Sequence, residues 1–180
     1  MAVKITYFVH GTTTDNEKNL ATGWAPGKLS DAGIKQAKEL GKFVSGKHFD
    51  VVFCSDLKRA VDSAKLGFDN YKIIKDKRLR ECNYGDFTEK PSAAFKNDLA
   101  KYIDKKFPNG ESYSDVEKRI GDFLHFLKKN YDGKHIAIVA HQAPQLALDV
   151  LLKGRTWKQA ISEDWRKNKA WRPGWDYVLK

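Results

Sequence analysis

Residues 5–17 read ITYFVHGTTTDNE: an apolar run rich in β-branched and aromatic residues stops at His10-Gly11, and three threonines follow. Such a run is typical of a buried β-strand. In an open α/β sheet, ligands bind beyond the carboxyl ends of the strands, which is where His10 stands. His10 is therefore a candidate functional residue if other parts of the chain bring partners to the same edge.

Two further apolar runs have the same character as Ile5–Val9, namely Val51–Cys54 and Ile136–Ala140. Each of the three is followed by a polar turn and then by a helical pattern. Shorter strands are expected near Tyr71–Ile74 and Tyr177–Leu179. Strands that alternate with helices predict an α/β fold, a three-layer α/β/α sandwich with a mostly parallel central sheet.

Helix starts and stops follow from the local chemistry of the sequence. Ser30 and Ser55 are each expected to cap a helix, and Ser114–Glu117 matches a capping box. The helix after Ala140 has Pro144 near its start and Gly154 at its end, as helix boundaries favour.

A single domain is expected over residues 1–180, because no linker, repeat or low-complexity segment interrupts the chain. Residues 79–107 fit the strand–helix alternation less well. They are expected to form a long excursion, part loop and part helix, that covers a site.

The composition favours a folded globular domain and argues against a membrane-spanning, disulfide-rich or zinc-binding protein. Hydrophobic residues make up 41% and charged residues 31% of the 180 residues, and no stretch approaches the length of a membrane span. The first residues do not read as a secretory signal. Cys54 and Cys82 give neither a disulfide framework nor a zinc pattern, which favours a reducing, cytoplasmic setting.

The formal net charge is +10, which favours anionic partners or, equally, spread lysines that keep the protein dissolved. Nucleic-acid binding is not favoured, because basic and aromatic residues are not interleaved and no Gly-rich recognition loop is present. No membrane partner is expected, and the oligomeric state stays open.

Three strand ends each deliver a basic side chain to one edge of the predicted sheet: His10, Arg59 in the first turn of a helix, and His141. Helix amino ends at that edge are expected to add unpaired backbone N–H groups. Together they predict an anion pocket, with phosphate as the obvious anion. Glu81 is a candidate proton donor, and a protonated His141 is expected to help Arg59 stabilise the phosphoryl oxygens. No His or Cys spacing suggests a metal, and no cofactor is expected.

The chain resembles the histidine phosphatase superfamily, in its phosphoglycerate mutase-like branch. The matching pieces occur in family order and are VHGTTTDN, LSDAGIKQA, CSDLKRAVDSA, LRECNYGDF, PNGES and IVAHQAP. The resemblance implies an α/β sandwich and a phosphohistidine mechanism. By position, it implies that His10 is the nucleophile, that Arg59 and His141 bind phosphate, and that Glu81 donates a proton.

The resemblance also reaches the residues around these four. Asn16 matches a phosphate-binding position, Thr13 matches the threonine of the opening motif, and Glu111 matches a residue near the substrate. Gln142 stands where the family often has glycine, and it is expected, with Thr13, Asn16 and Glu111, to take part in binding the substrate. The family's opening motif places an arginine before the histidine, and this chain has Val9 there.

A small, metal-independent phosphomonoesterase is the leading interpretation, acting on a small phosphorylated substrate. A phosphoglycerate mutase is the alternative within the same fold, although such mutases are usually longer. A phosphohistidine-protein phosphatase is less favoured, because the excursion would crowd a protein substrate. The absent arginine leaves open a weakly active or non-catalytic phosphate-binding domain. Trp171 and Trp175 of the tail either pack at the edge of the core or line the mouth of the site.

Overall fold

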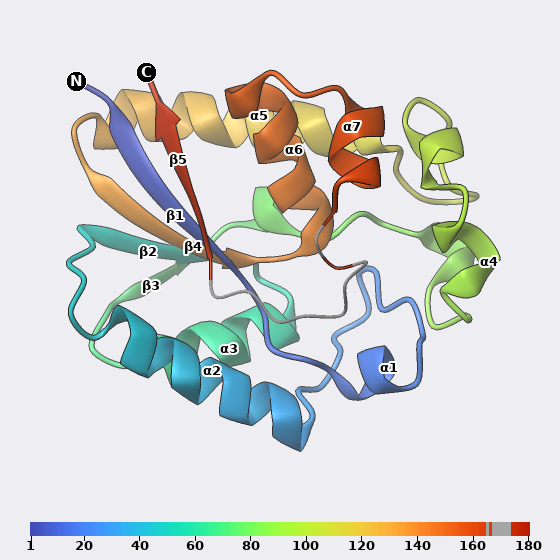
Figure 1. Ribbon diagram of the computed structural model, residues 1–180, viewed down its shortest axis with the longest axis horizontal. Helices are drawn as coiled ribbons and strands as arrows, with labels where there is room; N and C mark the ends of the chain where they lie inside the picture. Colours follow the sequence, from blue (N-terminus) through green and yellow to red (C-terminus); the bar gives the residue numbers. More distant parts are fainter. Residues whose placement is uncertain (165, 167–173) are drawn as a thin grey trace.

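The computed structural model describes residues 1–164, 166 and 174–180. Within them, a five-stranded sheet has the order β3-β2-β4-β1-β5 (Figure 1). The strands are β1 (Val3–Val9), β2 (Val51–Cys54), β3 (Ile73–Lys75), β4 (His135–Ala140) and β5 (Trp175–Leu179). Only β5 runs antiparallel to its neighbour, and the other pairs are parallel. The predicted α/β fold with a mostly parallel sheet is confirmed.

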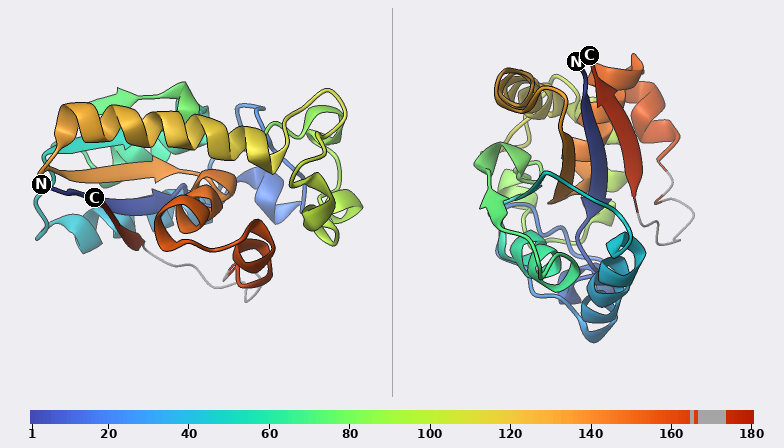
Figure 2. Two further views of the ribbon diagram at one scale, coloured as in Figure 1. Left: turned by 90° about the horizontal axis from the view of Figure 1, so that it is seen from above. Right: turned by 90° about the vertical axis from the view of Figure 1, so that its left-hand side faces the viewer.

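Helices cover both faces of the sheet, which gives three layers (Figure 2). One face carries α2 (Asp31–Val44) and α3 (Lys58–Gly67), and the other carries α5 (Tyr113–Tyr131) and α6 (Gln142–Lys153), with α7 (Trp157–Ser162) beside α6. Alternation along β1 places Tyr7 in the hydrophobic cluster of one face and Phe8 in that of the other. Both side chains are buried, so β1 contributes to both halves of the core.

Two predicted helix boundaries are correct. Ser30 caps α2, and its Oγ accepts a hydrogen bond from the Gly33 N–H. At the other end of the fold, α6 stops at Gly154, whose φ of 67° lies in the left-handed region that favours glycine.

Two other predicted boundaries are wrong. Ser55 does not cap α3: its Oγ accepts from the Leu57 N–H inside a turn, and the helix begins at Lys58. Ser114 does not cap α5, because Ser112 and Asp115 form the capping box two residues earlier. The earlier start makes Tyr113 the first residue of α5, and its side chain is 1% exposed. A helix capped by Ser114 would leave Tyr113 outside.

The excursion between β3 and α5 contains three 3₁₀ turns, Lys77–Leu79, Gly85–Phe87 and Leu99–Tyr102, and the short helix α4 (Ala93–Lys96). Aromatic rings hold it together. Tyr84 packs edge-on against Phe107, and Tyr102 stacks on Phe107 at 3.8 Å between centroids. The excursion is therefore a packed unit, able to hold side chains in place at the edge of the sheet.

A very short helix, α1 (Thr14–Glu17), follows β1 directly. No helix in the described part of the chain is long and apolar enough to cross a membrane.

Candidate active site

His10, Arg59 and His141 meet at the carboxyl edge of the sheet. His10 follows β1, His141 follows β4 as the residue that precedes α6, and Arg59 stands in the first turn of α3. The two imidazole centroids are 5.0 Å apart, and Arg59 Nε lies 3.3 Å from His10 Nε2. Parallel strands bring these side chains together because their carboxyl ends share one edge.

The hydrogen bonds of His10 fix which ring nitrogen carries its proton. Nδ1 lies 2.7 Å from the Gly11 carbonyl oxygen, which can only accept, so Nδ1 carries the proton. Nε2 faces Arg59 Nε, which can only donate, so Nε2 holds the lone pair. Burial, followed by the charge of Arg59, lowers the pKa of His10 from 6.5 to about 3. The ring is therefore neutral near pH 7, with a nucleophilic Nε2.

Arg59 is 1% exposed and is held by loop carbonyls. Its Nη1 donates to Ala25 O at 2.9 Å and its Nη2 donates to Gly23 O at 2.8 Å. A guanidinium has five N–H groups, and these two bonds with the contact to His10 use three of them. One N–H on each terminal nitrogen has no acceptor among the described residues, which leaves a fixed cation able to bind an anion.

His141 is fully buried, and Tyr7 holds its backbone. The Tyr7 hydroxyl donates to His141 O at 2.6 Å and accepts from His141 N at 2.9 Å. Neither ring nitrogen of His141 has a hydrogen-bond partner in the described part of the chain. Buried polar groups are rarely left in this way, so the ring is set to bind a ligand.

The expectation of a protonated His141 needs correction. Burial, Arg59 and His10 together hold the pKa of His141 well below its usual value, so the ring is neutral with these neighbours alone. A phosphate dianion between the two histidines would reverse the charge balance and favour the imidazolium. His141 can thus gain its proton as the anion binds.

Glu81 lies at the start of the excursion, with its carboxylate against the first turn of α6. Its Oε1 accepts from Cys82 N and Ala143 N, both at 2.9 Å, and its Oε2 accepts from Gln142 N at 3.2 Å. These contacts correct another expectation, since the N–H groups at the start of α6 bind Glu81 instead of remaining unpaired. At α3, the Arg59 N–H is likewise taken by Pro26 O.

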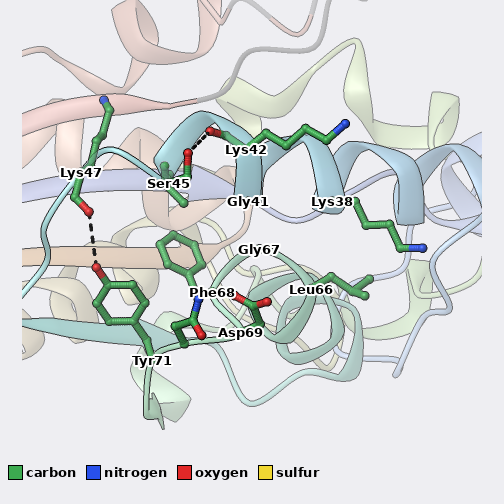
Figure 3. Close-up of a pocket in the computed structure, with 12 residues that line it drawn as sticks. Lys38, Gly41, Lys42, Ser45, Lys47, Leu66, Gly67, Phe68, Asp69 and Tyr71 are labelled. Atoms are coloured by element: carbon green, nitrogen blue, oxygen red, sulfur yellow. Dashed lines mark hydrogen bonds between the residues drawn. The ribbon is translucent and has the colours of Figure 1, made fainter.

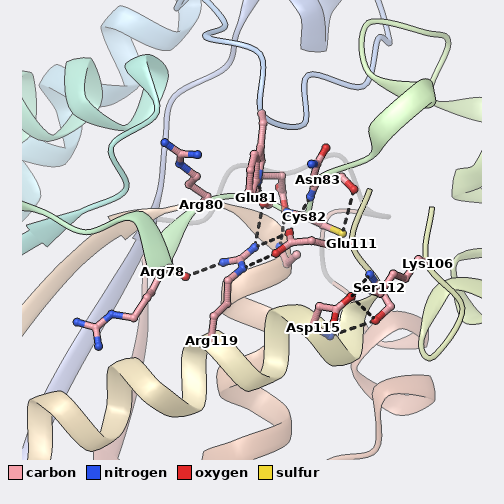
Figure 4. A network of polar contacts seen from close by, with 12 residues as sticks. Arg78, Arg80, Glu81, Cys82, Asn83, Lys106, Glu111, Ser112, Asp115 and Arg119 are labelled. Carbon is pink, nitrogen blue, oxygen red and sulfur yellow. Dashed lines mark hydrogen bonds and ion pairs between the residues drawn. The ribbon is translucent and has the colours of Figure 1, made fainter. Parts of the chain in front are cut away.

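The backbone of Glu81 is held from two sides. Its carbonyl oxygen accepts from Trp24 Nε1 at 2.7 Å and from Arg119 Nη2 at 2.9 Å. Arg119 also binds Glu111 and the Arg78 carbonyl, as Figure 4 shows. The proton-donor candidate therefore rests on a rigid polar network.

A cavity of about 60 Å³ opens among these groups. Five of the sequence-predicted residues line it: His10, Asn16, Arg59, Glu81 and Gln142. The excursion adds Tyr84 and Lys96 to the wall. The volume suits a small group such as phosphate, and the wall carries both cations and hydrogen-bond donors.

Two predicted site residues, Thr13 and Glu111, lie behind the wall. Thr13 caps α1, and its backbone N–H donates to Asn16 Oδ1 at 3.0 Å, which leaves the Asn16 amide nitrogen as the donor for the cavity. Glu111 is paired with Arg119 Nε at 2.9 Å and accepts from Asn83 N. The structure thus places both residues as supports of groups that line the cavity.

Close backbone packing explains two glycines of the quoted motifs. A Cβ on Gly33 would lie 1.9 Å from the Thr12 carbonyl oxygen, and one on Gly11 would lie 2.3 Å from Gly33 O. The loop after β1 therefore contacts the start of α2 directly, and both residues must be glycine. This contact fixes the position of the loop that carries His10.

Val9 lies at the end of β1, paired in register with Ala140 of β4. It packs at the edge of the cluster that contains Tyr7, while Phe8 stays buried at 1% exposure in the opposite cluster. β1 therefore keeps the alternation of buried side chains on its two faces up to Val9, although the family's arginine is absent. Of the two tail tryptophans, Trp175 is buried at 5% exposure beside Tyr7, and Trp171 lies outside the described residues.

Sequence reasoning missed four residues that line or support the site: Tyr7, Trp24, Lys96 and Arg119. Tyr7 reads as an ordinary strand aromatic, and its partner is 134 residues away. Arg119 had a usable signal, since it lies three residues after Val116 and next to Ile120, beside the apolar stripe of α5. A charged residue there needs a buried partner, and Glu111 supplies it.

A larger cavity, of about 660 Å³, lies elsewhere (Figure 3). Lysines of α2 and the loop after it line one side, namely Lys38, Lys42 and Lys47, and the end of α3 lines the other. Its lining contains no histidine and shares no residue with the cavity at His10. In the described residues, no group of three or more His, Cys, Asp or Glu side chains is placed to hold a metal ion.

Comparison with known proteins agrees with this geometry. The family model of the histidine phosphatase superfamily (branch 1) matches residues 7–175. A phosphoglycerate mutase of Schizosaccharomyces pombe is 32% identical over 176 residues, which covers 86% of this chain and 82% of that protein. The fructose-2,6-bisphosphatase TIGAR of Xenopus tropicalis is 37% identical over 134 residues, covering 68% of this chain and 49% of that longer protein.

Solved structures give the same result. The alpha-ribazole phosphatase of Shigella flexneri superposes with a TM-score of 0.76 at 26% identity, covering 87% of this chain and 83% of that one. The family match spans nearly the whole chain. Of the four residues that carried the resemblance, His10, Arg59 and Glu81 line one cavity, and His141 packs behind His10 with its ring centroid 5.0 Å away. The chain belongs to the histidine phosphatase superfamily.

Proposed function

We propose that this protein is a metal-independent phosphomonoesterase that cleaves a small phosphorylated substrate through a phosphohistidine intermediate. The observation that carries the proposal is the state of His10: a neutral ring in the cavity wall, with Nδ1–H bound to Gly11 O and Nε2 unprotonated. The Nε2 lone pair accepts from Arg59 Nε, and this contact is given up when Nε2 attacks phosphorus. A positioned neutral imidazole can attack phosphorus directly.

In the first step, His10 Nε2 forms a bond to phosphorus while the bond from phosphorus to the ester oxygen breaks. The ester oxygen takes the electron pair of that bond, and Glu81 gives it a proton. Arg59 and the Asn16 amide nitrogen bind the phosphoryl oxygens, and His141 joins them once the anion has raised its proton affinity. The side chains of Arg59 and Asn16 are held by loop contacts before the substrate arrives, so these two donors need little reorganisation.

In the second step, a water molecule attacks phosphorus and gives a proton to Glu81. The bond from phosphorus to Nε2 breaks, its electron pair returns to His10, and inorganic phosphate leaves. The cycle regenerates neutral His10 and protonated Glu81. Balance of atoms and charge needs no metal or redox partner.

A phosphoglycerate mutase-type transfer is the second candidate, favoured by the names of relatives such as the Schizosaccharomyces pombe enzyme. It would require the phosphoenzyme to be attacked by a second hydroxyl of the substrate instead of water. The cavity of about 60 Å³ has room for little more than a phosphoryl group, which favours hydrolysis over the reorientation of a whole substrate. The buried free thiols Cys54 and Cys82 agree with the proposed cytoplasmic setting.

The test is hydrolysis of nitrophenyl phosphate with and without a chelator. We expect equal rates in both. Loss of activity on chelation, with recovery on adding a divalent ion, would contradict the proposal. Transfer to phosphoglycerate that exceeds release of phosphate would favour the mutase instead.

A further inference from the structure

The side chain of Gln142 has a fixed orientation at the wall of the proposed phosphate cavity. Gln142 is the first residue of α6, and its Nε2 donates to Asp164 Oδ2. Asp164 is paired with Arg166, whose Nη1 lies 2.8 Å from the other carboxylate oxygen. A carboxylate paired with a guanidinium only accepts hydrogen bonds, so the amide nitrogen of Gln142 must face Asp164.

The anchor for this orientation is rigid. Asp164 is 8% exposed, and its Oδ1 also accepts from the Arg166 backbone N–H. Arg166 Nη1 donates to Gln145 Oε1 at 3.1 Å, one turn along α6, and Gln145 in turn donates to Tyr177 of β5. Asp164 is thus tied to the core, and it can hold the Gln142 amide in one orientation without a substrate.

The oxygen of a planar amide points away from its nitrogen. With Nε2 on Asp164, Oε1 of Gln142 points away from the Asp164 carboxylate, and no described residue donates to it. A carbonyl oxygen repels the oxygens of a phosphate dianion and attracts a hydrogen-bond donor. Gln142 is therefore unsuited to bind the phosphoryl group through its side chain.

We propose that Gln142 Oε1 accepts a hydrogen bond from a hydroxyl on the carbon next to the phosphorylated one. This inference rests on the proposed phosphomonoesterase function and names its substrate class: phosphate esters of polyols, sugars or hydroxy acids. Asp164 is a positioning residue, which acts by orienting the Gln142 amide. Substrates without that hydroxyl leave Oε1 unpaired on binding, which is where the selectivity arises.

The experiment compares 2-hydroxyethyl phosphate with 2-fluoroethyl phosphate. Fluorine is small and cannot donate, and it makes the alcohol at least as good a leaving group. The wild type should favour the hydroxyl substrate in kcat/KM by roughly five- to tenfold, the worth of one neutral hydrogen bond. In Gln142→Leu the preference should disappear.

Asp164→Asn tests the positioning role, because an asparagine amide can donate to Gln142 and allow its amide to turn over. We expect the preference for the hydroxyl substrate to fall at least threefold. Glu163→Gln is the matched control: it removes the same charge one residue away, from a side chain paired with Arg155, and should leave the preference unchanged.

The outcomes separate this inference from the proposed function. Hydrolysis of nitrophenyl phosphate together with equal kcat/KM values for the two test substrates overturns the inference and leaves the proposed function intact. An equal loss on both substrates in Gln142→Leu also overturns it, because Gln142 would then act on the attacking water or on the fold. Absence of turnover on all three substrates overturns the proposed function and the inference with it.

Discussion

Tyr7→Phe removes one oxygen atom, and that atom satisfies both backbone groups of His141. The hydroxyl donates to His141 O at 2.6 Å and accepts from His141 N at 2.9 Å. His141 is fully buried, so water cannot replace the lost partner. Burial raises the pKa of Tyr7 well above its usual value, so the hydroxyl keeps its proton and serves both bonds across the accessible pH range.

The expected cost follows from leaving a buried N–H and a buried C=O unpaired. Each such group costs about 1–3 kcal/mol, so the free energy of unfolding should fall by about 2–6 kcal/mol. Activity should fall further than stability alone explains, because the His141 ring is no longer held against His10. Catalytic geometry is sensitive to displacements of the order of 1 Å.

The assay is urea unfolding combined with nitrophenyl phosphate kinetics at a temperature where the variant is folded. Tyr177→Phe serves as the control, since its hydroxyl is also buried but bonds to Asp149 and Gln145, away from the two histidines. It should lose stability while keeping most of the activity on this substrate. A Tyr7→Phe protein that unfolds within 0.5 kcal/mol of wild type would refute the reasoning, on the usual scale of surface substitutions.

Three further predictions follow from the site. Between pH 6.5 and about 4, His10 and His141 bind protons in the unfolded chain but stay neutral in the folded protein. The free energy of unfolding should therefore decrease as the pH is lowered, by up to ~1.4 kcal/mol per pH unit for each histidine. His141→Asn should make this pH dependence less steep in denaturant titrations, and parallel curves for the variant and the wild type would contradict the prediction. Glu81→Gln should slow alkyl phosphates about 10²–10⁴-fold but aryl phosphates much less, because only the former need a proton on the leaving oxygen; equal losses would remove Glu81 from that role. Inserting arginine between Val9 and His10 should raise kcat/KM at least tenfold, given that one preorganised donor is typically worth about 10²–10³; an unchanged rate would mean that another group already does this work.

The sheet and the meeting of His10, Arg59 and His141 could be predicted because they depend on local patterns. An apolar run of strand length predicts a strand, and parallel strands must end at one edge. Helix boundaries were harder where two signals competed. Ser112 with Asp115 and Ser114 with Glu117 both match a capping box, and burial of Tyr113, a tertiary effect, selects the first.

The supports of the site could not be predicted, because they join residues far apart in the sequence. Tyr7 reaches His141, Arg119 reaches the Glu81 carbonyl, and Asp164 reaches Gln142. The protonation of His141 was wrong for a related reason. Its pKa depends on full burial beside His10 and Arg59, and the sequence does not show how deeply a strand end is buried.

Trapping of the phosphoenzyme tests the central claim most directly. The protein is mixed with a phosphomonoester, quenched in alkali within milliseconds to preserve phosphohistidine, digested and sequenced by mass spectrometry. The neutral, oriented ring of His10 predicts a phosphoryl group on the peptide that contains residue 10, labile to acid and absent from His10→Ala. A stable adduct on another residue, or the same adduct in His10→Ala, would contradict the account.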